Sequence, residues 1–99
     1  MADFNTPLVV AAKERIALVI QVLRANNSGW TDTLQFLLDG MEDRYSTREN
    51  LFKIGELCHP KALGDDVIDG YSAFEWIDVV SCLHDDCARA FNELERMAP

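Results

Sequence analysis

The sequence lacks the patterns that mark most enzymes and metal-binding proteins. Its two histidines, His59 and His84, stand beside no glycine-rich turn and do not have the spacing of zinc ligands. Its three cysteines, Cys58, Cys82 and Cys87, form neither a C-x₂-C motif nor a disulfide framework. We therefore expect free thiols, with Cys87 buried and Cys82 exposed on one helix. We also expect a protein that is not an enzyme and binds no cofactor or metal.

One acidic segment approaches the pattern of a calcium-binding loop without completing it. Asp65, Asp69 and Gly70 occupy the first, fifth and sixth positions of such a loop. However, Val67 stands at the third position and Trp76 at the twelfth, where calcium requires oxygen ligands. We therefore interpret residues 65–70 as a solvated acidic loop.

Membrane-spanning and secretion signals are missing as well. Charged and amide side chains interrupt the most apolar stretch, residues 6–27, too often for a bilayer core. The first residues do not combine a basic start, an apolar segment and a small-residue cleavage site. We therefore expect the protein in the cytoplasm, where cysteines stay reduced.

Residues 6–27 organise the predicted fold. Projected as a helix, their apolar side chains cover roughly 200° of the surface, so this helix requires neighbours on two sides. Asn5 or Thr6 can cap it, Pro7 suits its first position, and the Asn-Asn-Ser-Gly sequence at 26–29 suits its end. With 99 residues and 48% hydrophobic composition, the chain predicts one domain over residues 1–99.

Three further helices are expected. The second runs from a cap at Thr31 to about Arg44. The third starts at a capping box over residues 46–49 and ends at His59-Pro60. The last covers residues 72–97.

The start of the last helix carries the strongest local signal. Ser72 and Glu75 have the spacing of a capping box, and Tyr71 can pack on Trp76 as a hydrophobic staple. A short helical turn is expected between residues 61 and 68. Since no period-two strand pattern occurs, the fold class is an all-α bundle of four main helices, with the first and last helices central.

The acidic residues are unevenly distributed. The formal charge is −8, and residues 62–88 contain seven acids and no lysine or arginine. Such a charge disfavours direct binding to nucleic acid or anionic lipid and favours basic protein partners. A role in solubility alone is the competing interpretation. The candidate protein-binding acids are Asp65, Asp66, Asp69, Glu75, Asp78, Asp85 and Asp86.

Two phenylalanines fall outside the predicted apolar faces. Phe36 points away from the apolar face of the second helix, and Phe52 points away from that of the third. Either the helices are sandwiched between neighbours, or the rings are exposed anchors for a protein partner. We expect one ring to be sandwiched and leave the other open.

The function hypothesis follows from this charge and from the missing catalytic motifs. We expect a non-enzymatic inhibitor whose acidic face binds a nucleic-acid-handling protein and blocks nucleic-acid binding or partner recruitment. The alternative is a helical adaptor or regulatory module that uses an apolar patch around Phe36 or Phe52. The last helix is long enough for its end to project and pair with a second copy, which leaves a homodimer open.

In length, acidity, helical content and missing catalytic motif, the chain resembles the small inhibitors that phages and mobile elements encode, notably the anti-CRISPR proteins. This resemblance rests on no shared motif and therefore assigns no residue. It implies a Cas protein or a multisubunit CRISPR surveillance complex as the partner. It also implies the cytoplasm of the host cell as the location.

Overall fold

In the computed structural model, four α-helices and one short 3₁₀ turn form an all-α bundle, and residues 4–59 and 61–97 are described here. The α-helices are α1 (Pro7–Ala25), α2 (Trp30–Asp39), α3 (Arg44–Leu57) and α4 (Ala73–Met97). The 3₁₀ turn, η1, spans Leu63–Asp65 and confirms the short turn expected before the last helix. Among these residues there is no strand, which confirms the predicted fold class.

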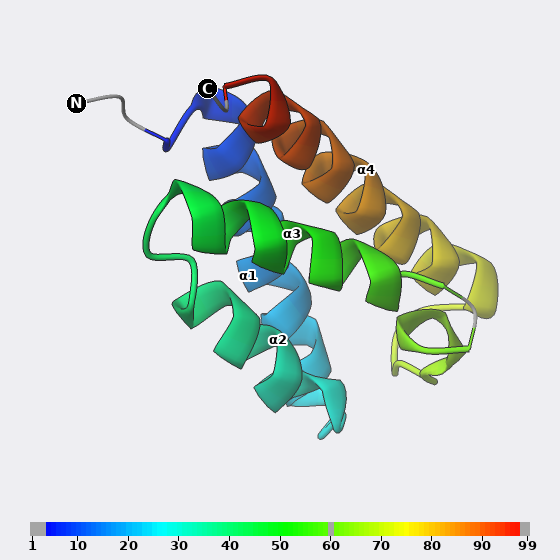
Figure 1. The fold of residues 1–99 in the computed structure, drawn as a ribbon. Coiled ribbons are helices and arrows are strands. Elements are labelled where there is room, and N and C mark those ends of the chain that lie inside the picture. The colour runs from blue at the N-terminus through cyan, green and yellow to red at the C-terminus, as the bar shows by residue number, and fades with distance from the viewer. Residues whose placement is uncertain (1–3, 60, 98–99) are drawn as a thin grey trace.

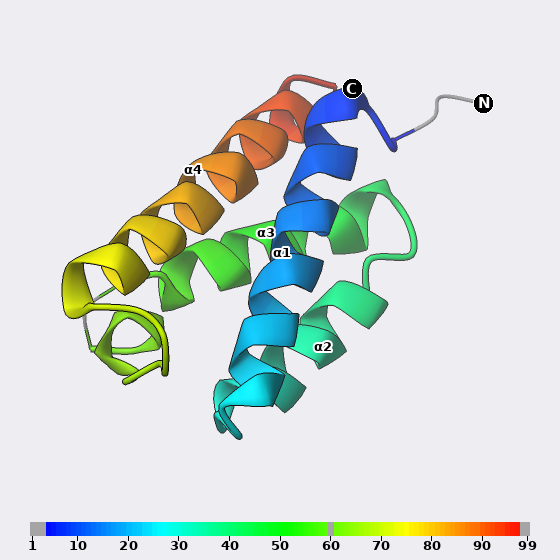
Figure 2. The same cartoon turned by 180° about the vertical axis from the view of Figure 1, so that it is seen from behind.

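The helices pack in a chain of neighbours. α4 packs along both α3 and α1, and α1 also packs against α2. Figures 1 and 2 show that the start of α1 and the end of α4 lie at one end of the molecule. The segment that contains η1 lies at the other end, beside the start of α4. The molecule is elongated, with principal extents of 43 × 21 × 20 Å.

α1 begins and ends as its sequence predicts. The Thr6 hydroxyl accepts a hydrogen bond from the Val9 amide, and Pro7 is the first helical residue. Asn27 adopts a left-handed conformation, with φ 54°, just past the C-cap. The buried face is narrower than expected, because Leu18 is 56% exposed and Ala11 is also exposed. Neighbours therefore cover α1 over less than the predicted 200°.

The boundaries of α2 and α3 differ from the prediction. α2 starts at Trp30, whose amide donates to the Ser28 hydroxyl, so Thr31 is a buried helical residue and not the cap. The capping box of α3 pairs Asp43 with Ser46, so helix α3 starts at Arg44. Ser46 therefore fills the third helical position and not the cap, because Asp43 offers a better acceptor one turn earlier.

The start of α4 is confirmed in detail. The Ser72 amide donates to Glu75 Oε1 at 2.8 Å, and the Glu75 amide donates to the Ser72 hydroxyl at 3.1 Å. The Tyr71 ring packs edge-on against Trp76, with 5.8 Å between centroids. Trp76 is buried, and its indole N–H donates to the Leu63 carbonyl oxygen at 2.7 Å. The loop before α4 is thus attached to the core through Trp76.

Hydrogen bonds and an ion pair also fix the two ends of the bundle. At one end, Arg44 donates to the Met97 carbonyl oxygen, and Arg48 pairs with Glu95 at 2.9 Å. These contacts hold the start of α3 against the end of α4. At the other end, the Asp69 amide donates to the Asn26 side chain, which ties the acidic loop to the end of α1.

Candidate functional site

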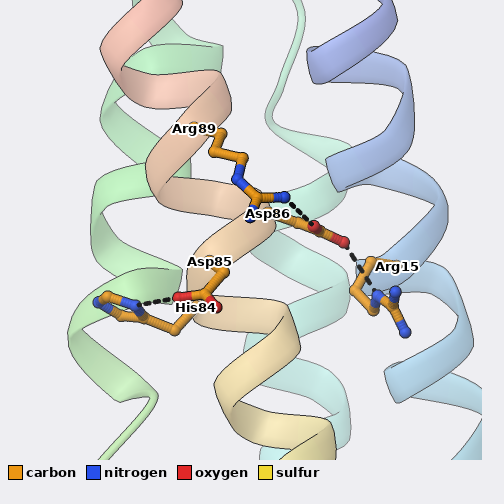
Figure 3. Close-up of polar contacts among 5 residues, drawn as sticks. All are labelled: Arg15, His84, Asp85, Asp86 and Arg89. Carbon is orange, nitrogen blue, oxygen red and sulfur yellow. Dashed lines mark hydrogen bonds and ion pairs between the residues drawn. The ribbon is translucent and has the colours of Figure 1, made fainter.

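The predicted acidic surface divides into three parts in the structure. The first part, which we call the acidic end, joins the loop before α4 to the first turns of α4. Its members are Asp65, Asp66, Asp69, Glu75 and Asp78. Asp85 lies further along α4, where it is exposed and contacts His84 (Figure 3). Asp86, although adjacent in sequence, faces α1 (Figure 3).

The charge pattern predicted a free carboxylate at Asp86, but the structure shows that this carboxylate is paired. Its Oδ2 accepts a hydrogen bond from Arg15 Nε at 2.9 Å, and its Oδ1 lies 3.9 Å from Arg89. This hydrogen bond raises the pKa of the Arg15 guanidinium. Arg89 lies three residues further along α4, whereas Arg15 reaches Asp86 from α1. Asp86 therefore joins two helices and contributes little charge to the outside.

The acids of the acidic end have different local roles. Asp66 is half-buried and accepts a hydrogen bond from the Ser28 hydroxyl at 2.6 Å, which helps to fix the loop. Hydrogen bonding to the backbone amide of Ser72, and then to its side chain, lowers the pKa of Glu75 below its ordinary value. Asp65, Asp69 and Asp78 are exposed, and within the described residues no ion pair involves their carboxylates. These three supply the free charge.

Two exposed apolar side chains that were not among the predicted site residues accompany these acids. Val67 is 92% exposed, and Phe74, the second residue of α4, is 83% exposed. Helical spacing places Phe74 about 160° from the buried Trp76, a signal that was available in the sequence. An apolar contact with acids around it has the composition of a protein-binding surface.

The two candidate phenylalanines are both exposed, so the expectation that one would be sandwiched is wrong. Phe36 on α2 is 77% exposed, and Phe52 on α3 is 52% exposed. The reason is that α2 packs mainly on α1 and α3 packs mainly on α4, and the opposite side of each helix has no covering helix among the described residues. Phe52 still has a neighbour, since its ring lies 5.5 Å from that of Phe91 on α4.

Thiols and histidines form no metal-binding group in the described part of the chain. No three His, Cys, Asp or Glu side chains there could hold a metal ion. Cys87 is buried and Cys82 is exposed, as expected. Burial raises the pKa of Cys58 to about 12, which leaves its thiol protonated at neutral pH. His84 Nδ1 lies 3.6 Å from Asp85, at the surface.

No described helix combines the length and apolarity that a bilayer crossing requires. Comparison with family models, with curated proteins and with solved structures found no match to this chain.

Proposed function

We propose that this chain is a non-enzymatic protein-binding domain whose acidic end docks onto a basic surface of another protein. The observation that carries this proposal is the set of exposed carboxylates of Asp65, Asp69 and Asp78, none of which is paired with a cation in the described residues. Val67 and Phe74 supply exposed apolar area beside them.

The expected partner is a protein that handles nucleic acid. Carboxylates and phosphates present similar fields to lysine and arginine, so an acidic domain can occupy a groove that otherwise binds nucleic acid. Inhibition would then follow from occupancy alone and would need no chemistry on the part of this chain. Charge steering would also speed the encounter of the two proteins.

A pair of charge-reversal variants tests the proposal. The first, the acidic-end variant, changes Asp65, Asp69 and Asp78 to lysine. The matched control changes Glu14, Asp39 and Glu42 to lysine. Each variant changes the formal charge from −8 by +6 to −2, so the two differ in the location of charge and not in its amount.

The measurement is capture of proteins from a nuclease-treated bacterial lysate, with identification of what is bound. We expect the wild type and the control to retain a nucleic-acid-binding protein that added DNA or RNA displaces. We expect the acidic-end variant to lose it by about tenfold or more, and capture to weaken between about 50 and 300 mM salt. Equal capture by both variants would refute the acidic end as the contact.

The narrower form of the proposal is an inhibitor of the anti-CRISPR kind, whose partner is a Cas protein or a CRISPR surveillance complex. Its support is the length, net charge and helical fold of the chain. The test is plating of a CRISPR-targeted phage on cells that express the chain. Restored plaque formation that the acidic-end variant loses supports this form, and unchanged immunity across CRISPR types refutes it.

A second candidate function is a helical adaptor that uses an apolar patch. The exposure of Phe36 and Phe52 favours it. Salt separates the two candidates, because an apolar contact responds weakly to ionic strength whereas an acidic contact weakens steeply.

A further inference from the structure

A groove runs along the outer side of the contact between α3 and α4, away from the acidic end. Its largest hollow has a volume of about 340 Å³. Buried Leu51 and Cys87 line it together with the exposed ring of Phe52 and the partly buried ring of Phe91. Its volume falls in the range of protein binding pockets, and exposed apolar surface often marks an interaction site.

Two smaller hollows extend this groove in both directions. Toward the end of α4, a hollow of about 250 Å³ shares Phe52 and Phe91 with the largest one. Toward the start of α4, a hollow of about 140 Å³ lies beside Ile77 and Ser81. From Ile77 to Glu95 the row covers roughly 27 Å of helix α4. A row of hollows suits side chains at helical spacing, whereas a small ligand would fill one of them.

Gly55 keeps the middle of the groove open. It lies inside α3 and lines the largest hollow. A Cβ added there would meet just one atom, His84 Cδ2, at 4.0 Å, which is an ordinary contact distance. Packing therefore does not require glycine at this position, although glycine inside a helix lowers stability by about 0.5–1 kcal/mol relative to alanine.

The charges along the groove define the chemistry of its occupant. Arg48 pairs with Glu95 at 2.9 Å, and Lys53 lies 4.0 Å from Glu49, so these charges largely cancel. Glu56 on α3 lines the hollow, and no described lysine or arginine pairs with it. On the α4 side, Asp85 is exposed and its one ion-pair neighbour among the described residues is His84.

We infer that the α3–α4 groove binds an amphipathic helix of a partner protein, with apolar residues in the row of hollows and basic residues beside Glu56 and Asp85. The helix-in-groove mode matches the length and apolar lining of the groove. The unneutralised Glu56 on the α3 wall and Asp85 beside the wall residue His84 favour a basic helix over an acidic one. This inference goes beyond the acidic end and stands even if the acidic end binds nothing.

The test uses defined peptides and the full chain labelled with ¹⁵N. The probe is a synthetic helix of about 18 residues, made of leucine and lysine with leucines at i, i+3, i+4 and i+7. One comparison peptide has the same composition in an order that forms no apolar face, and the other replaces lysine by glutamate. The readout is the set of amide chemical shifts of Gly55, His84 and Ala88 during titration.

Two variants plug the groove from opposite walls without changing any charge. These are Gly55→Leu on α3 and Ala88→Leu on α4, since both positions line the largest hollow. The matched control, Phe36→Ala, removes an exposed ring on α2 and leaves the groove intact. The acidic-end variant is the second control, because it separates this inference from the proposed function.

We expect the leucine–lysine helix to shift the three groove amides and to bind about tenfold more tightly than either comparison peptide. Each plugging variant should weaken this binding about tenfold or more, while Phe36→Ala and the acidic-end variant keep it. Equal binding by a plugged variant, or shifts confined to other residues, would overturn the inference. So would self-association of the wild type, measured by sedimentation, that Gly55→Leu abolishes, because the occupant would then be a second copy.

Discussion

The two sides of α4 carry similar residues but face different surroundings. On the side toward α1, Asp86 reaches Arg15 at 2.9 Å and is largely covered. Away from α1, Asp85 one residue earlier is exposed beside His84, which lines the groove. One carboxylate stabilises the contact between two helices, whereas the other remains available to a partner. Acidity in a sequence therefore does not by itself define an acidic surface, because the fold decides which charges are neutralised.

Thiol reactivity should show the largest contrast along α4. Cys82 is exposed, whereas Cys87 is buried on the floor of the groove and burial raises its pKa. Cys58, whose pKa burial raises to about 12, lies at the end of α3. At pH 8 we expect Cys82 to react with an aromatic disulfide reagent about a thousandfold faster than the other two. The measurement is thiol titration followed by peptide mapping.

Reaction of all three thiols at similar rates in the native chain would mean that the groove opens to its floor. The unfolded chain in denaturant provides the control, since there the three thiols should react alike.

The same substitution on the two sides of α4 should have unequal effects on stability. Ala90 is fully buried, and Ala88 lines the groove. Ala90→Leu has no free space and should lower the free energy of unfolding by about 1–3 kcal/mol through overpacking. Ala88→Leu projects into the open hollow and should change it by less than about 0.5 kcal/mol. Urea denaturation of both variants measures the difference, and equal losses would show that the groove is closed in solution.

Removal of one charge from each side of α4 should give the smallest contrast. Asp86→Asn breaks the ion pair with Arg15, which is partly solvent-exposed, and should cost about 0.5–1 kcal/mol. Asp85→Asn removes an exposed carboxylate and should change stability by a few tenths of a kcal/mol at most. Thermal denaturation at low and high salt is the measurement, and salt should reduce the Asp86 effect. If Asp85→Asn lowered stability as much as Asp86→Asn, this would contradict the division of α4 into a covered and an open side.

Local sequence signals predicted those parts of the fold that neighbouring residues control. Thr6 caps α1, Asn27 ends it in a left-handed conformation, and Ser72 with Glu75 caps α4, each through contacts within a few residues. Where two local signals competed, the prediction was wrong. Asp43 accepts a hydrogen bond from the Ser46 amide and forms a capping box with it. Helix α3 therefore begins at Arg44, two residues before the cap expected at Ser46.

The sequence by itself determined that the chain forms helices and carries most of its net negative charge between residues 62 and 88, because helical periodicity and residue type are local properties. The tertiary structure alone decided that Arg15 would neutralise Asp86, that Phe36 and Phe52 would both be exposed, and that a groove would open beside Gly55. These outcomes depend on which helices lie side by side and at what separation. Residues 71 positions apart, such as Arg15 and Asp86, meet only after the helices pack.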